Sequence, residues 1–271
     1  EGMVIWIDDA EAPETDGAMV IRYNTGNSAD NIFYDDTVTI TSDDTNPVDI
    51  LDMDTYDNGN DGDIPYTASD LATDTLVVNS GYDLLVKIKS GVTAGSDVFD
   101  PNGTVSFNGS DNLHIDDDSD AYLDTNSNSI GGDVTVDSGA TLNINGNTSV
   151  SGGDITVTGT TTGTATVTMP NSGTIGGGGS ITFNTLTISP GATTTIGSTI
   201  TVSGGNLTTT TTGSIDYSGT PTVNLDGTGT LGGGSGSITF YNLDVGDGTS
   251  DTTTVSTAIT VDNTLSVNTN Q

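Results

Sequence analysis

The sequence GTATVTMPNSGTIGGGGSITFNTLTI, residues 163–188, recurs as GTPTVNLDGTGTLGGGSGSITFYNLDV at residues 219–245, with one residue inserted in the glycine run. Each copy contains short apolar alternation, a glycine cluster, a strand-like SITF and a strand-like L-x-[IV] segment. A unit of this size cannot bury an apolar face by itself, so we expect its copies to stack on one another.

The pattern extends to both sides, which makes four copies of a repeat of about 52–59 residues. The copies are TLVVNSGYDLLV (75–86), DVTVDSGATLNI (133–144), TLTISPGATTTI (185–196) and the looser NLDVGDGTSDTTTV (242–255). The spacing between the starts of successive copies is similar but not constant. A period of this length predicts two or three strand layers for each copy.

Apolar residues within the copies fall in pairs two positions apart, such as Val134/Val136 and Leu142/Ile144. This spacing predicts short strands with one face directed inward, whereas helix-like spacing is almost absent. The predicted fold class is therefore all-β: a parallel, right-handed β-helix (β-solenoid) whose layers stack about 4.8 Å apart. A β-sandwich is the alternative that short strands with many turns also allow.

The repeats divide the chain into two parts. Residues 1–74 are the least repetitive, and MVIWI (3–7), MVIRY (19–23), NIFY (31–34) and TVTI (37–40) indicate strands joined by acidic loops. We expect this segment to be an N-terminal β-rich cap or small domain, which also takes part in assembly, because the last layer of a stack exposes unpaired backbone groups. Residues 75–271 are the predicted β-solenoid.

The composition excludes several classes of partner. The net charge is −34, and the only cations are Arg22, Lys87 and Lys89, so no basic patch for nucleic acid can form. An anionic membrane surface is disfavoured for the same reason. The absence of cysteine excludes disulfides, and no apolar run is long enough for a transmembrane helix.

Two longer phrases carry a family resemblance: SITFNTLTISPGATTTIGSTITVSGGNLT (180–208) and SITFYNLDVGDGTSDTTTVSTAITVDNTLSVN (237–268). They resemble the β-strand repeats of large secreted surface proteins of bacteria and archaea, a group that includes adhesins, sheath proteins and surface-layer proteins. The resemblance covers about residues 75–271. It implies a parallel β-helix and an extracellular or cell-surface location.

Two clusters of aspartates are candidate calcium sites, because Ca²⁺ takes six to eight oxygen ligands from a bending backbone. One lies in DMDTYDNGNDGD (52–63), a predicted loop that lacks the final glutamate of an EF-hand, and the other in HIDDDSDAYLD (114–124). The alternative is that both are solvated acidic loops. The candidate ligands are Asp52, Asp54, Asp57, Asp61 and Asp63 in the first cluster, and Asp116, Asp117, Asp118 and Asp120 in the second.

Catalytic residue sets are not evident, and we do not expect an enzyme. His114 is the only histidine, so the sequence predicts neither a histidine-based metal site nor a catalytic triad. Gly227–Gly232 matches G-x-G-x-x-G, but a strand-like segment follows where a dinucleotide site needs a helix, so these glycines are predicted to form turns.

The expected function is that of an extracellular structural protein: a subunit or segment of a filament, sheath or surface layer that assembles by strand or end-to-end contacts, with calcium as a candidate cofactor. The alternative is an adhesin or glycan-binding surface module. Aromatic side chains for stacking on sugars would then be drawn from Trp6, Tyr56, Tyr66, Tyr82 and Tyr122.

Overall fold

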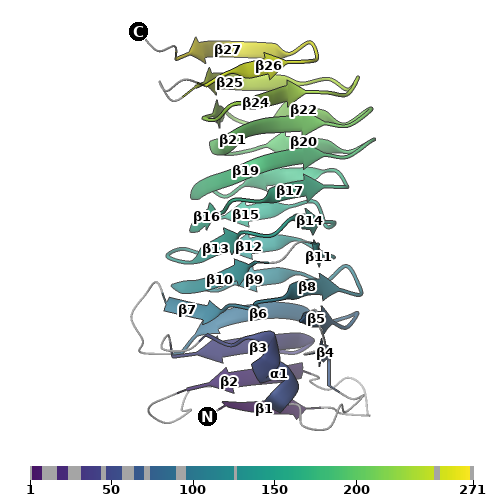
Figure 1. Cartoon of the computed structure of the whole chain (residues 1–271), viewed down its shortest axis with the longest axis vertical. Helices are drawn as coiled ribbons and strands as arrows, with labels where there is room; N and C mark the ends of the chain where they lie inside the picture. Colours follow the sequence, from purple (N-terminus) through teal and green to yellow (C-terminus); the bar gives the residue numbers. More distant parts are fainter. Residues whose placement is uncertain are drawn as a thin grey trace.

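The computed structural model describes residues 2–7, 17–23, 32–43, 47–56, 64–69, 74–89, 96–124, 127–246 and 251–268. These residues are nearly all β, and their stacked parallel strands form an elongated solenoid of about ten turns (Figure 1). The prediction of an all-β fold built as a parallel β-solenoid is confirmed.

One face of the solenoid is a ten-stranded sheet, here called sheet A, which runs from the N-terminal end towards the C-terminal end. Its strands pair in parallel, except that β1 is antiparallel to β2. In order across the sheet they are β1 (Gly2–Ile7), β2 (Gly17–Arg22), β3 (Thr37–Ser42), β6 (Asp83–Ile88), β9 (Leu113–Ile115), β12 (Val134–Val136), β15 (Ile155–Val157), β18 (Gly173–Gly176), β20 (Thr193–Ile196) and β22 (Ser214–Tyr217).

The remaining strands form sheet B, which contributes two strand positions to most turns. Its strands also pair in parallel, except for β4 with β5. They are β4 (Tyr66–Ser69), β5 (Thr75–Val78), β7 (Ser96–Phe99), β8 (Thr104–Phe107), β10 (Ser119–Leu123), β11 (Asn128–Ile130), β13 (Thr141–Ile144), β14 (Thr148–Val150), β16 (Thr160–Thr162), β17 (Thr166–Met169), β19 (Ser180–Ile188), β21 (Ile200–Thr209), β23 (Thr222–Leu225), β24 (Gly229–Gly232), β25 (Thr239–Val245), β26 (Thr253–Val255) and β27 (Thr260–Val267).

The length of one turn follows from the strand pairing. Val134 pairs with Leu113 on the preceding turn and with Ile155 on the following turn, at the same separation in sequence. The repeat copies that begin at residues 133 and 185 are thus about two and a half turns apart, and they lie on different sheets, the first on β12 and the other on β19. The repeat seen in the sequence is therefore not the repeating turn of the structure.

Strands of residues 1–74 belong to the same stack. β2 pairs in parallel with β3, and β3 pairs in parallel with β6, so sheet A continues without a break into the segment that was expected to be a cap. β1 then reverses direction and ends the sheet at the N-terminal end of the molecule (Figure 1).

Helix α1 (Ile50–Tyr56) lies where the sequence predicted an acidic loop. The backbone N–H of Asp52 donates to Asp49 Oδ1 at 2.7 Å, and the N–H of Asp49 donates to Asp52 Oδ2 at 3.3 Å. This reciprocal capping satisfies backbone donors at the start of the helix, and Ile50 and Met53 are fully buried. The loop prediction was therefore wrong for residues 52–56, because capping and apolar burial outweigh the low helix propensity of aspartate.

The interior of the solenoid is a single apolar core built from columns of stacked side chains. Alternate residues of each short strand point inward, and those at equivalent positions of successive turns lie in register. One such column consists of Val48, Phe99, Ala121, Leu142, Thr161, Ile181, Ile200, Val223 and Leu243. All of these side chains are buried.

Several polar side chains inside the core form hydrogen bonds to a neighbouring turn, whereas the hydroxyl of the buried Thr194 has no partner among the described residues. Asn128 is buried, and its Oδ1 accepts a bond of 2.9 Å from the backbone N–H of Val105 on the preceding turn. The hydroxyl of Thr161 accepts a bond of 3.2 Å from the N–H of Thr182 on the next turn. These bonds remove most of the penalty of burying polar groups, and they also tie neighbouring turns together.

The glycine runs form corners where two turns approach closely. Gly177 has a φ of +115°, and a Cβ at that position would lie 2.3–2.6 Å from backbone atoms of Val157 on the preceding turn. Only glycine fits this combination of left-handed backbone and close approach.

Among the residues described, no helix has the length and apolar character needed to cross a membrane.

Candidate functional site

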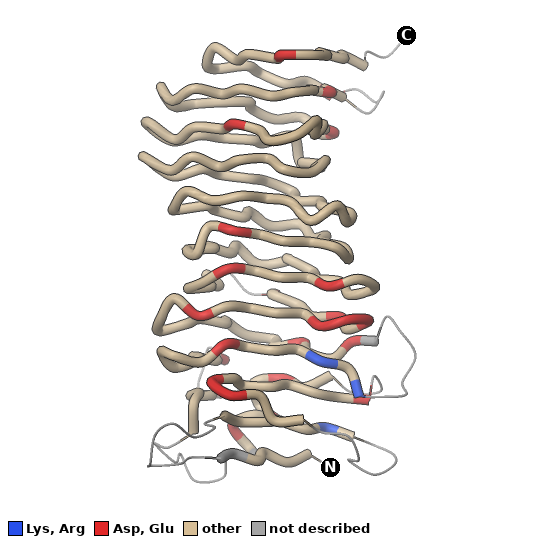
Figure 2. Tube along the Cα trace, turned by 180° about the vertical axis from the view of Figure 1, so that it is seen from behind, with Lys and Arg blue, Asp and Glu red and all other residues tan. Residues whose placement is uncertain are grey.

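The three cations of the sequence all lie towards the N-terminal end, whereas acidic residues occur along the whole solenoid (Figure 2). Each cation has a partner. Arg22 forms an ion pair with Asp52, and Lys87 forms one with Asp116. The ammonium group of Lys89 lies 4.4 Å from the centre of the Tyr23 ring, a cation–π contact.

The described residues of the first acidic cluster do not converge on a common point. Asp52 binds Arg22 and caps α1, and Asp54 is exposed on the same helix. The other predicted ligands of this cluster, Asp57, Asp61 and Asp63, lie outside the described residues. Asp52 therefore has a structural role in which its carboxylate is already bound.

The second acidic cluster is divided between two faces of the solenoid. Asp116 follows β9 on the outer side of sheet A, and Asp117 and Asp118 are exposed in the turn after it. Asp120 lies on β10 in sheet B, where burial raises the pKa of its carboxyl, partly offset by a hydrogen bond with Thr141. Of these four residues, the structure brings Asp116 together with other groups that can bind a metal ion.

Those groups are His114 and Asp137. His114 lies on β9, two residues before Asp116, and Asp137 follows β12 on the next turn. One ligand atom from each of the three side chains lies within 4.8 Å of the other two. His114 Nε2 is 2.7 Å from Asp137 Oδ2. We call His114, Asp116 and Asp137 the sheet A cluster.

This cluster was not predicted from the sequence, because the presence of a single histidine argued against a histidine-based metal site. The signal was the spacing between Asp116 and Asp137, which equals the length of one turn. Ile115 pairs with Val136 in the parallel ladder, so the aspartates that follow them occupy the same outward position on consecutive turns. The proximity of Asp116 and Asp137 could be predicted only once the length of one turn was known.

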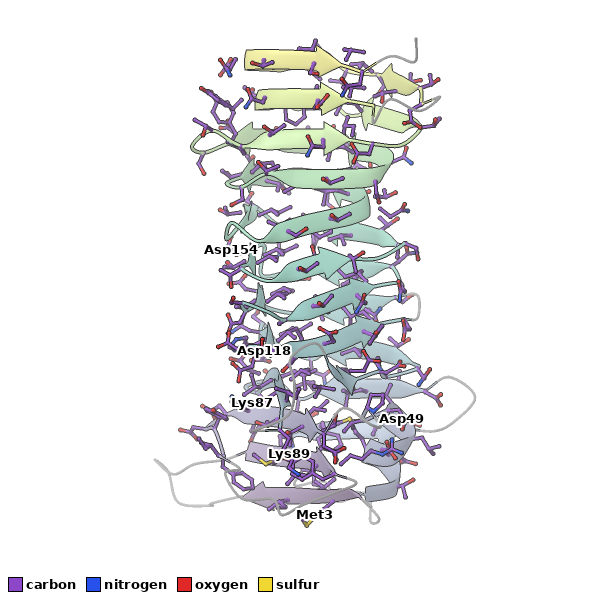
Figure 3. All side chains as sticks on the ribbon, turned by 90° about the vertical axis from the view of Figure 1, so that its left-hand side faces the viewer. Met3, Asp49, Lys87, Lys89, Asp118 and Asp154 are labelled. Atoms are coloured by element: carbon purple, nitrogen blue, oxygen red, sulfur yellow. The ribbon has the colours of Figure 1, made fainter. Side chains whose placement is uncertain are left out.

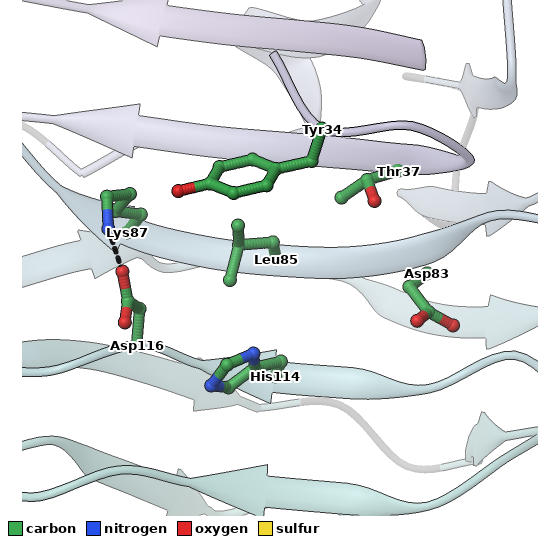
Figure 4. A pocket seen from close by; sticks show the side chains of 7 residues that line it. All are labelled: Tyr34, Thr37, Asp83, Leu85, Lys87, His114 and Asp116. Atoms are coloured by element: carbon green, nitrogen blue, oxygen red, sulfur yellow. Dashed lines mark hydrogen bonds and ion pairs between the residues drawn. The ribbon is translucent and has the colours of Figure 1, made fainter. Parts of the chain in front are cut away.

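A shallow groove of about 230 Å³ adjoins the sheet A cluster (Figure 4). It is lined by Tyr34, Thr37, Asp83, Leu85, Lys87, His114 and Asp116. Burial opposes the charge of Lys87, but its hydrogen bond to Asp116 and the negative charge of that carboxylate outweigh this effect, so its pKa is raised. Lys87 therefore holds one side of the cluster as a cation.

A second group of carboxyls lies on sheet B, where Asp97 and Asp120 are direct neighbours on adjacent turns. Burial and a hydrogen bond with the Asp124 carboxyl raise the pKa of Asp100 to about 6. Burial and a hydrogen bond of 2.8 Å to Asp97 raise the pKa of Tyr122. Burial, together with the hydrogen bond and negative charge of the neighbouring Asp124, therefore raises the pKa of Asp100 enough to keep it protonated at mildly acidic pH.

The C-terminal turn exposes apolar side chains that are interior elsewhere. Leu265 and Val267 on β27 pair in register with Leu243 and Val245, and they are 56 % and 59 % exposed. Val255 on β26 is 52 % exposed and pairs with the buried Leu231. These residues form an apolar surface across the described end of the stack.

The glycine motif at residues 227–232 has no features of a nucleotide site. Gly229–Gly232 forms β24, and the next described element is a strand, β25. A Cβ on Gly229 would lie 2.4 Å from the backbone of Gly205 on the preceding turn, so this glycine allows close stacking of turns.

Comparisons with protein-family models, curated proteins and solved structures gave no match for this chain.

Proposed function

We propose that this protein is a structural element of an extracellular or cell-surface assembly, a filament, sheath or surface layer, in which copies of the chain contact one another end to end. The observation that carries the proposal is the apolar C-terminal surface formed by Val255, Leu265 and Val267. These side chains continue the columns of the core, so their natural partner is another strand layer with the same spacing.

The unpaired edge of β27 also favours a partner that adds a strand to sheet B. Within the described part of the chain, β27 pairs only with β25, which leaves one row of its backbone N–H and C=O groups available. An exposed and partly apolar strand edge of this kind is a template for adding a further strand. Strand addition would satisfy these groups and cover Leu265 and Val267 in one step.

The partner surface in this proposal is β1 at the opposite end of another copy. β1 pairs only with β2 among the described residues, and Met3 on this strand is 44 % exposed (Figure 3). The two ends of the solenoid differ from each other, so their contact is heterologous. Heterologous contacts that do not close into a ring produce fibres.

The net charge opposes association unless cations are present. With a net charge of −34, copies repel one another at low ionic strength. Sodium reduces this repulsion by screening, whereas a bound calcium ion would also neutralise specific carboxylates. Assembly should therefore need salt, and a comparison of CaCl₂ with NaCl at equal ionic strength separates screening from specific calcium binding.

Light scattering and negative-stain images of the purified chain test the proposal. We expect end-to-end filaments in the presence of calcium, and we expect the double variant Leu265→Lys/Val267→Lys to remain monomeric, because it places charge on the apolar surface. Thr264→Lys is the matched control, since Thr264 is on the same strand but faces outward beside Asn242. A wild-type monomer under all these conditions, or a double variant that assembles normally, would contradict the proposal.

One observation favours a glycan-binding role as a second candidate. The rings of Tyr217 and Tyr241 lie 5.6 Å apart on neighbouring turns, and the Tyr217 hydroxyl donates to Asp262 at 2.6 Å. A tyrosine ring combines a flat apolar face with a polar hydroxyl, and a sugar ring can stack on such a face while its hydroxyls bond to a nearby carboxylate. Of the aromatic residues expected for this role, Tyr66 is buried in the core, and the side chains of Trp6 and Tyr56 lie outside the described set.

A glycan array would test this second candidate. Saturable binding that is lost in Tyr241→Ala and retained in Tyr34→Ala, which changes a tyrosine near the other end of the solenoid, would support it. An array without saturable binding would leave the structural role as the only proposal of the two.

A further inference from the structure

We propose that the sheet A cluster, His114, Asp116 and Asp137, binds a divalent transition-metal ion such as Zn²⁺ on the outer face of the solenoid. The inference is independent of the assembly proposed above, because the cluster lies on a side face, many turns from β27 (Figure 1).

The distances suit a metal ion of this size. One ligand atom from each residue already lies within 4.8 Å of the other two. Zinc binds nitrogen and oxygen ligands at about 2.0–2.2 Å, so bound ligand atoms lie about 3–4 Å from one another. The three ligand atoms are therefore already close to the separation that a bound zinc ion requires.

The backbone under the cluster is held in place by the parallel ladder. His114 pairs with Thr135, and Ile115 pairs with Val136, so the separation of β9 and β12 is set by their hydrogen bonds. Val136 and Ile115 are both fully buried in the core. The three ligands therefore project from a rigid surface, which lowers the entropy cost of binding.

The types of ligand indicate the class of metal. An imidazole nitrogen with two carboxylates suits zinc and its neighbours in the first transition row, whereas calcium takes six to eight oxygen ligands. Three protein ligands on an open surface leave at least one coordination position for water. The side chains of His114, Asp116 and Asp137 are 39 %, 20 % and 32 % exposed, so an ion can reach them from solvent.

Electrostatics explains what the ion would stabilise. Asp116 and Asp137 lie on adjacent turns, and two carboxylates at that separation repel each other. Lys87 forms an ion pair with Asp116, which the dashed line in Figure 4 marks, and Asp137 instead contacts the His114 ring. A divalent cation between the two carboxylates would neutralise both, and it would compete with the ammonium group of Lys87 for Asp116. Lys87 is thus a competitor of the metal rather than a ligand.

The test uses the full chain after removal of metal with EDTA. Zn²⁺ is titrated by calorimetry in a millimolar excess of Ca²⁺, which occupies weak carboxylate sites on the acidic surface, and Co²⁺ is followed by its visible absorption. We expect one Zn²⁺ per chain, and a Co²⁺ spectrum that Ca²⁺ does not remove and Zn²⁺ does.

Four variants make the test specific. His114→Gln and Asp137→Asn should weaken Zn²⁺ binding by about tenfold or more, since loss of a ligand should cost at least as much as loss of a supporting residue. Asp118→Asn removes an exposed carboxylate close by and should bind as the wild type does. Lys87→Gln removes the competing cation and should tighten binding, which a merely structural role for Lys87 would not produce.

Circular dichroism without metal shows whether each variant is folded. The substituted side chains are on the outer face, so we expect unchanged spectra. The proposal is overturned if no stoichiometric Zn²⁺ binding remains in excess Ca²⁺, or if a folded His114→Gln protein binds Zn²⁺ as well as the wild type. Binding that Asp118→Asn weakens as much as Asp137→Asn would also overturn it.

Discussion

Leu243 and Leu265 stack in register on neighbouring turns, yet Leu243 is 1 % exposed and Leu265 is 56 % exposed. The two residues have the same side chain and the same orientation in the ladder. They differ in that Leu243 is covered by a following strand layer and Leu265 is not covered by any described residue. The difference between their exposed fractions therefore shows how much of a leucine side chain one further strand layer covers.

The same pair gives the first prediction. In the monomer, Leu243→Ala should lower the free energy of unfolding by about 2–5 kcal/mol, because it removes a buried side chain and leaves a cavity. Leu265→Ala should change it by no more than about 0.5 kcal/mol. Urea unfolding followed by circular dichroism measures both values. Equal losses in the two variants would show that Leu265 is already buried in solution.

Gly177 and Gly178 allow a test of how closely neighbouring turns approach each other at a glycine corner. Gly177 and Gly178 have φ values of +115° and +87°, so alanine at either position meets a left-handed backbone that costs roughly 1–2 kcal/mol. Only at Gly177 would the new Cβ also collide with the backbone of Val157. Gly177→Ala should therefore be less stable than Gly178→Ala by about 1–3 kcal/mol. Thermal melts of the two variants compare them directly, and indistinguishable melts would contradict the close approach of the turns.

Asp100 should make stability depend on pH. Its pKa is raised to about 6 in the folded protein, against 3.8 for an ordinary aspartate. The folded state therefore binds the proton more tightly than the unfolded state, so this contribution to stability is complete below pH 3.8 and is lost as the pH rises through about 6. Above that pH the ionised carboxyl destabilises the fold beside Asp124.

The substitution Asp100→Asn isolates this effect. The variant should melt at a higher temperature than the wild type above pH 6, and the difference should shrink as the pH falls. Asp154→Asn, on a distant turn, controls for the general loss of one negative charge from an acidic protein. If Asp100→Asn and Asp154→Asn shift the melting temperature equally at every pH, the raised pKa of Asp100 is contradicted.

The capping of α1 gives a prediction with opposite signs for two aspartates. Asp49→Ala removes the carboxylate that accepts the N–H of Asp52, so it should destabilise the helix by about 1 kcal/mol. Asp54→Ala replaces an exposed aspartate within the helix by a better helix former, so it should stabilise the helix by a few tenths of a kcal/mol. Hydrogen exchange of the α1 amides reports both changes. Faster exchange in Asp54→Ala than in Asp49→Ala would contradict the assigned cap.

Much of the fold was predictable from local patterns. The pairs Val134/Val136 and Leu142/Ile144 predicted short strands with one inward face, and both pairs are buried in successive strands of the same turn. This works because alternation along a strand is a local property that any single turn displays. The helix at Ile50–Tyr56 was missed, because its stability comes from Asp49 and from burial of Met53 rather than from its own propensity.

The fold class could be read from local patterns in the amino-acid sequence. Period-two apolar pairs and glycine corners predicted short strands, and the recurring segments favoured a parallel stack over a β-sandwich, because copies too small to bury a face alone must stack. The charge of −34 was likewise readable without a structure, and it sets how the surface responds to salt.

Contacts between side chains on the surface, in contrast, follow from the way in which successive turns stack. His114, Asp116 and Asp137 come together because the parallel ladder pairs Ile115 with Val136, which lies one turn later in the chain. The copies recognised in the sequence recur at unequal intervals that do not match a whole number of turns, so they could not reveal this pairing. Outward neighbours depend on the register between turns, and that register results from the packing of the whole core rather than from any one segment.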